Sequence, residues 1–203
     1  MIETVRYTYR LRPGAVAERA LLDEWHRCRF LWNEAVHQQK AGNKPTFCRL
    51  SKMLTEARGK FPWLRDGSQV AQQQALRNYA LALDHSFRVK GRRWPAMRKR
   101  HASLPTLEYT TNGFSIRDGR LILPKGVSIP VVWSRELPAE PTSVRIGQDS
   151  LGYWHASFVV TRETEPALEA AGAVFIDSAQ GWGVMVLNKP PAIRAPRASH
   201  SRG

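Results

Sequence analysis

The sequence lacks long hydrophobic runs. No stretch of its 203 residues approaches the roughly 18 apolar residues that a membrane-spanning helix requires. The first residues, MIETVRYTYR, also lack the apolar run of a secretory signal peptide. We therefore expect no membrane partner and a cytoplasmic location.

Cysteine is scarce, and the only two residues are Cys28 and Cys48. Two cysteines are too few for a disulfide framework and do not by themselves complete a four-ligand zinc site. The six histidines include no pair at the i and i+4 spacing of a helical metal site. We expect both thiols to be buried, and we expect no cofactor.

Acidic residues are outnumbered, with 17 Asp+Glu against 31 Lys+Arg and a formal net charge of +14. Residues 1–100 hold 21 basic and 8 acidic residues, a net charge of +13, whereas residues 101–203 hold 10 and 9, a net charge of +1. A basic excess of this size is typical of proteins with a polyanionic partner. The first half of the chain is expected to carry that surface.

Periodicity predicts a strand and three helices in the first half. Alternating apolar and polar residues favour a strand over residues 4–11. Apolar residues at helical spacing predict helices over about 15–40, 47–58 and 68–87, with Thr46 and Ser68 as N-caps of the second and third. The apolar stripe of the third helix is expected to place Phe87 inward.

Short strands follow the helices. The segment FSIRDGRLILP predicts a hairpin around Asp118 and Gly119, a pair favoured in tight turns. VSIPVVW, TSVRIGQD and YWHASFVVT have the composition of further strands. Together they predict a small antiparallel barrel or sandwich that the first strand can join.

The segment FRVKGRRWPAMRKR, residues 87–100, combines seven basic residues with Phe87 and Trp94. Guanidinium groups match the oxygens of phosphate, and an aromatic face can stack on an unpaired base. Packing of Phe87 in the core and a loop anchored by Trp94-Pro95 are the simpler readings for the aromatics, whereas the charges favour a nucleic-acid surface. The candidate contacts are Arg88, Lys90, Arg92, Arg93, Trp94, Arg98, Lys99 and Arg100, together with Arg49 and Lys52 on the second helix.

Asp177 follows the apolar residues AVFI, as an acidic residue does at the end of the first strand of an RNase H-like sheet. Hydrolysis by two metal ions requires several carboxylates around the same ions. Residues 178–203 contain no Asp or Glu. Asp177 is therefore a vestigial catalytic candidate without later partners, and an exposed turn residue is the alternative.

Six stretches in this order resemble the N-terminal part of the TnpB or OrfB proteins of bacterial insertion sequences, RNA-guided nucleases related to type V CRISPR effectors. They are YRLRPG with CRFLWNEAV, VAQQQALRNYALALDHSF, RRWPAMRKR, RLILPKGVSIPV, GYWHASFVV and VFIDSAQGWGV. Phe175 and Ala179 stand where the family favours glycine, and the family's later catalytic carboxylates and zinc ribbon are not found in this sequence.

The resemblance implies an α+β fold: a small, wedge-like antiparallel β-barrel interrupted by a three-helix recognition lobe and followed by an incomplete RNase H-like (RuvC) strand pair. The expected parts are the first barrel strand (1–12), the basic helical lobe (13–104), the rest of the barrel (105–165), a truncated start of the RuvC-like domain (166–189) and a disordered tail (190–203). DNA and a guide RNA are the implied partners, and Mg²⁺ would bind only if the nuclease site were completed.

The leading hypothesis is a nucleic-acid-binding fragment of a TnpB-like nuclease without cleavage activity of its own. A nuclease completed by a partner chain and a helix-turn-helix regulator of duplex DNA remain as alternatives, as does a decayed element.

Overall fold

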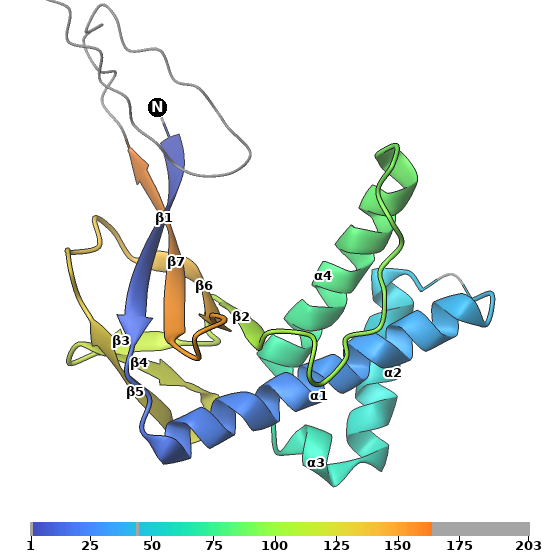
Figure 1. Ribbon diagram of the computed structural model, residues 1–203, viewed down its shortest axis with the longest axis horizontal. Helices are drawn as coiled ribbons and strands as arrows, with labels where there is room; N and C mark the ends of the chain where they lie inside the picture. The colour runs from blue at the N-terminus through green and yellow to red at the C-terminus, as the bar shows by residue number, and fades with distance from the viewer. Residues whose placement is uncertain (1, 44, 164–203) are drawn as a thin grey trace, which may run out of the picture. The chain divides into compact units, whose positions relative to one another are not determined.

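The computed structural model describes residues 2–43 and 45–163, which form an α+β structure (Figure 1). Its helices are α1 (Ala15–Lys40), α2 (Phe47–Lys60), α3 (Pro62–Arg65) and α4 (Gln69–Arg88), with a 3-10 turn, η1, at Pro124–Gly126. Its strands are β1 (Ile2–Leu11), β2 (Thr106–Thr110), β3 (Ser115–Arg117), β4 (Arg120–Leu123), β5 (Val127–Val132), β6 (Pro141–Gln148) and β7 (Trp154–Glu163).

The seven strands form one curled antiparallel sheet, a half-barrel, in the order β2-β6-β7-β1-β5-β4-β3. The first strand of the chain therefore lies in the middle of the sheet, between β7 and β5. Its pairing with β7 places Tyr9 opposite Ala156, and both side chains are buried. The prediction that the N-terminal strand joins the later strands is confirmed.

The hairpin between β3 and β4 turns at Asp118 and Gly119, as the sequence predicted. Both residues have positive φ, 49° and 69°. Two consecutive left-handed residues define the turn whose twist matches that of an antiparallel pair. Trp133 supports the turn, because its indole Nε1 donates a hydrogen bond of 2.9 Å to the Gly119 carbonyl oxygen.

Both predicted N-caps are confirmed. The Thr46 hydroxyl accepts a hydrogen bond from the backbone N–H of Arg49, and the Ser68 hydroxyl accepts one from Ala71. Helix α3 and strand β2 were not predicted from the sequence. Helix α3 is a single turn, and strand β2 has five residues and pairs with β6, more than 30 positions away along the chain. Local sequence pattern therefore gave little sign of either element.

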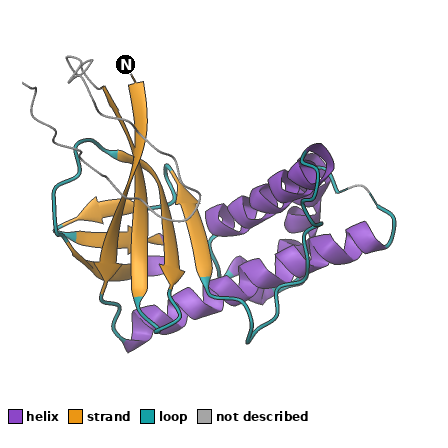
Figure 2. Cartoon of the chain, turned by 45° about the horizontal axis from the view of Figure 1, so that its top comes forward, coloured by secondary structure: helices purple, strands orange, loops and turns teal. Residues whose placement is uncertain are grey.

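The apolar stripe of α1 packs into two different cores. Leu21, Trp25 and Cys28 join the core inside the half-barrel, whereas Trp32 and Val36 join a core formed with α2, α3 and α4. Figure 2 shows the strands gathered on one side and these helices on the other, with α1 running along both. One long helix thereby fixes the helical part against the sheet.

The start of α4 is held by a buried carboxylate. Glu24 Oε2 accepts a hydrogen bond of 2.9 Å from the Ser68 backbone N–H and lies 3.4 Å from Arg27 Nη1, and Glu24 Oε1 accepts one of 3.3 Å from Gln72 Nε2. Burial raises the pKa of Glu24 above its ordinary value, against the lowering effect of these partners. Gly67 leaves room for this arrangement, because a Cβ there would overlap Glu24, Arg27 and Gln72.

Two expectations from the sequence are wrong. Phe87 does not point into the core: 67% of its surface is exposed, because the helical core ends at Leu83 and the last turn of α4 projects beyond α1 and α2 (Figure 1). Cys48 is also exposed, although Cys28 is buried as expected. The predicted RuvC-like strand pair and tail, residues 166–203, lie outside the described residues.

Candidate nucleic-acid interface

Residues 89–105 form an extended segment, here called the strap, that leads from α4 to β2. The strap contains six Lys or Arg residues and no Asp or Glu. A turn at its start reverses the chain: the Arg92 backbone N–H donates to the Val89 carbonyl, and Gly91 has a φ of +84°. Glycine suits this position because a side chain disfavours left-handed backbone.

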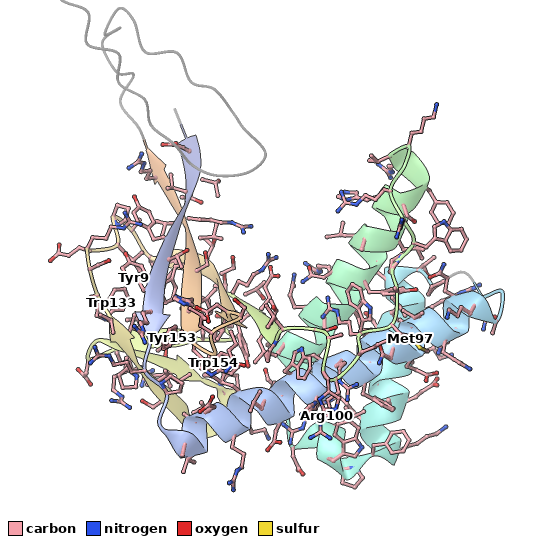
Figure 3. The ribbon with its side chains drawn as sticks, viewed as in Figure 1. Tyr9, Met97, Arg100, Trp133, Tyr153 and Trp154 are labelled. Atoms are coloured by element: carbon pink, nitrogen blue, oxygen red, sulfur yellow. The ribbon has the colours of Figure 1, made fainter. Side chains whose placement is uncertain are left out.

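Side chains of α1 hold the strap in place, and Trp32 and Asn33 make the shortest of these hydrogen bonds. Trp32 Nε1 donates a hydrogen bond of 2.9 Å to the Ala96 carbonyl oxygen. The Asn33 side chain bonds both backbone groups of Arg98, accepting from its N–H at 2.8 Å and donating to its carbonyl oxygen at 3.1 Å. The strap therefore keeps one fixed path beside α1, where Figure 3 labels its residues Met97 and Arg100.

Arg98 differs from the other cations of the strap. Its guanidinium carbon lies 3.6 Å from the centroid of the Trp32 ring, and burial lowers the pKa of its guanidinium. The other basic side chains of the strap are exposed: Lys90, Arg92, Arg93, Lys99 and Arg100. Arg98 thus packs the strap onto α1, while its neighbours present charge to solvent.

The remaining candidate cations occupy other elements. Arg88 is in the last turn of α4, where its Nε lies 3.0 Å from Asp84 Oδ1 in an exposed ion pair. Arg49 and Lys52 are exposed on α2. Six of the candidates therefore share the strap with Trp94, whereas Arg49 and Lys52 lie on a separate helix.

Trp94 and Phe87 form an exposed aromatic pair at the junction of α4 and the strap. Their ring centroids are 5.4 Å apart, with an angle of 60° between the planes. Trp94 is 57% exposed and Phe87 is 67% exposed. Large aromatic faces left open to water among basic residues are a typical platform for unpaired bases.

A second positive cluster joins the strap to α1. Burial lowers the pKa of His26, and the nearby positive charges of Arg29 and Arg100 lower it further, against a smaller effect of Asp23. Arg29 also lies against the Trp25 ring, 5.6 Å from its centroid. His26 therefore lies in a locally positive environment beside the strap.

No local sequence pattern predicted that Trp32 and Asn33 hold the strap, although both lie in the stretch CRFLWNEAV. Their partners are backbone groups more than 60 positions away. A polar Asn beside an inward-facing Trp was the available signal, since an amide that is partly buried needs hydrogen-bond partners.

Asp177, the candidate remnant of a metal site, lies outside the described residues. Within 2–43 and 45–163, no group of three or more His, Cys, Asp or Glu side chains is placed to hold a metal ion. In the same part of the chain no helix has the length and apolarity to cross a membrane.

These features define an α+β protein in which a helical part and a half-barrel are joined by an exposed basic strap. No protein-family model matches the chain. It is 30% identical over 190 residues to the "Putative RNA-guided DNA endonuclease" of Streptomyces pristinaespiralis, covering 88% of this chain and 47% of that protein. It is 27% identical over 182 residues to the "Putative RNA-guided DNA endonuclease InsQ" of Escherichia coli K12, covering 85% and 44%.

The resemblance seen in the motifs is thereby confirmed: the chain is a homologue of TnpB-type proteins. It spans less than half the length of each of these two relatives.

Proposed function

We propose that this chain binds nucleic acid, a guide RNA and DNA, through the strap. The observation that carries the proposal is the fixed strap itself, because Trp32 and Asn33 hold its backbone while five cations remain exposed. Charges carried on a backbone that is already held bind a polyanion with less loss of backbone freedom than charges on a loose loop. The names of the relatives, RNA-guided DNA endonucleases, support RNA and DNA as the partner classes.

The test compares two variants that lose the same charge. The first replaces Arg92, Arg93, Lys99 and Arg100 of the strap with Gln. The control replaces four exposed basic residues on other elements with Gln, namely Arg12, Arg19, Arg117 and Lys125. Binding to labelled RNA and DNA is measured by fluorescence anisotropy over a series of salt concentrations.

We expect the strap variant to lose affinity and to release about four fewer counterions on binding, so that its affinity falls less steeply with salt. The control should retain most of its affinity. About six phosphate contacts in the wild type predict a roughly thousandfold loss of duplex affinity between about 50 and about 200 mM salt. An affinity that does not change with salt, or equal losses in the two variants, would contradict the proposal.

We also propose that the chain does not cleave nucleic acid alone. Hydrolysis by two metal ions needs several carboxylates, and residues 178–203 after Asp177 contain none. Purified chain with Mg²⁺ and target DNA should leave the DNA intact. Cleavage that is lost on Asp177→Asn would establish instead that the chain carries a working site.

A further inference from the structure

A pocket of about 450 Å³ lies between α4, the strap and β2. Its lining includes the buried residues Cys28, Ala71 and Leu107, which form its inner wall. Exposed groups such as His85 and Arg92 line its outer part. The volume lies within the range of about 300 to 1,000 Å³ that is common for small-molecule sites in proteins.

Half of the six residues that α4 contributes to the pocket lining are small. Three of its lining residues, Ala71, Ala75 and Ala82, end at Cβ. Small side chains repeated along one face of a helix leave a slot against which a flat group can lie. Together with Leu107 they give the pocket an apolar wall that suits the face of an aromatic ring.

The charged part of the lining is mainly cationic. Arg92 and Arg98 reach the pocket from the strap and Arg145 from β6, against one carboxylate, Glu108 of β2. Glu108 Oε2 accepts hydrogen bonds of 2.9 Å from Asn78 Nδ2 and 3.0 Å from Arg145 Nη2. Among the described residues no hydrogen bond to Glu108 Oε1 is found, so this oxygen can accept an N–H of a ligand.

We propose that this pocket receives one unpaired nucleotide of a nucleic acid bound along the strap, a step that rests on the function proposed above. The base lies against the alanine face of α4, with an N–H group of its edge donating to Glu108. The attached phosphate is neutralised by Arg92 and Arg145. A base in a duplex is already paired and stacked, so the pocket selects single-stranded segments.

The test fills the pocket without changing charge. Ser103 lines the pocket and is half-buried, whereas its neighbour Ala102 is exposed and does not line it. Ser103→Phe and Ala102→Phe therefore add the same ring at adjacent positions, one inside the pocket and one outside. Ala82→Leu fills the pocket from α4 as an independent second variant, and thermal unfolding monitored by circular dichroism checks that each protein is folded.

The probes are a single-stranded RNA of about ten nucleotides, carrying the fluorescent base 2-aminopurine at one position in turn, and a duplex of the same sequence. With wild-type protein, 2-aminopurine fluorescence should change sharply at one position. Ser103→Phe and Ala82→Leu should abolish that change and lower single-strand affinity roughly tenfold, with duplex affinity unchanged. Ala102→Phe should behave as wild type.

The other possible results contradict either the role of the pocket or the role of the strap. Single-strand affinity and fluorescence that are unaffected in a folded Ser103→Phe or Ala82→Leu variant would show that no nucleotide enters the pocket, while the strap proposal stands. Equal loss in Ala102→Phe and Ser103→Phe would place the effect on the strap rather than in the pocket. A wild-type chain that binds neither probe overturns the proposed function and this inference together.

Discussion

The guanidinium of Arg98 lies over the Trp32 ring, 3.6 Å from its centroid, while the Trp32 indole N–H donates to the Ala96 carbonyl two residues earlier in the strap. One aromatic side chain of α1 thus contacts the strap through its face and through its edge. The basic segment is therefore part of the folded structure rather than a free connector, and its cations divide into one that packs and five that are exposed.

Arg98 should contribute to the free energy of unfolding, whereas its neighbour Lys99 should contribute little. Arg98→Ala removes a partly buried cation from the Trp32 ring and is expected to lower the free energy of unfolding by about 1–2 kcal/mol. Lys99→Ala, at an exposed position, should change it by less than about 0.5 kcal/mol. Urea denaturation of both variants measures the difference, and equal values would mean that Arg98 does not fasten the strap.

Asn33 should affect binding without carrying any charge. Asn33→Ala removes the two hydrogen bonds to the Arg98 backbone and loosens the strap there, while the contacts of Trp32 remain. We expect faster amide hydrogen exchange in residues 96–100 and weaker nucleic-acid binding by roughly threefold to tenfold, because the cations lose their fixed positions. Asn43→Ala, at an exposed position after α1, is the control. Unchanged exchange in Asn33→Ala would contradict this role.

The aromatic pair Phe87 and Trp94 should contribute to single-strand binding only. Replacing both with Ala is expected to lower affinity for single-stranded RNA by roughly tenfold, because base stacking contributes about 1–3 kcal/mol per base. The salt dependence should not change, since no charge is lost. Leu151→Ala, which removes an exposed apolar side chain from the turn between β6 and β7, controls for surface hydrophobicity. An equal loss of duplex affinity in the double variant would argue against stacking.

His26 should report on an anion bound at the strap. Burial and the charges of Arg29 and Arg100 lower the pKa of His26 in the free protein. A bound phosphate backbone offsets these charges, so the pKa of His26 should rise on binding, which a proton NMR titration follows directly. Arg100→Gln should raise it in the absence of ligand. A pKa that is the same in the free and bound protein would place the polyanion elsewhere.

The lowered pKa of His26 should also make the stability of the protein depend on pH. Because the folded pKa of His26 lies below the unfolded value, the unfolded chain binds the proton more readily as the pH falls below about 6.5. The contribution of His26 to the free energy of unfolding should therefore decrease in that range. His26→Gln should make the stability less dependent on pH there.

Replacing Gly67 and Gly59 with alanine should change the free energy of unfolding in opposite directions. Gly67→Ala introduces a Cβ that overlaps Glu24, Arg27 and Gln72, and is expected to lower the free energy of unfolding by about 1–3 kcal/mol. Gly59→Ala, within α2, meets nothing within 4 Å and should raise it by about 0.5–1 kcal/mol. Thermal or urea unfolding of both variants tests this. A neutral Gly67→Ala would show that the Glu24 network relaxes readily.

Much of the fold was predictable because its signals are local. The helical periods of α1, α2 and α4, the caps Thr46 and Ser68, and the turn at Asp118 and Gly119 depend on residues that are close in the sequence. Local pattern did not determine the position of β1 in the middle of the sheet, since its pairing with β7 joins residues about 150 positions apart.

The candidate site was predicted as a set of residues but not as a surface. Seven basic residues in fourteen positions indicated a polyanion partner, and charge does not depend on the fold. Helical spacing alone predicted that Phe87 is buried, whereas its side chain is exposed. The helical periodicity continues past the point where neighbouring helices stop covering α4.

The sequence by itself determined the local elements, the excess of positive charge and the resemblance to TnpB-type proteins, because these follow from neighbouring residues and their order. Only the tertiary structure decided which cation is packed, which are exposed, and that a pocket lies behind the strap. Those properties depend on contacts such as Asn33 with Arg98, between residues far apart in the chain, and no local pattern specifies such contacts.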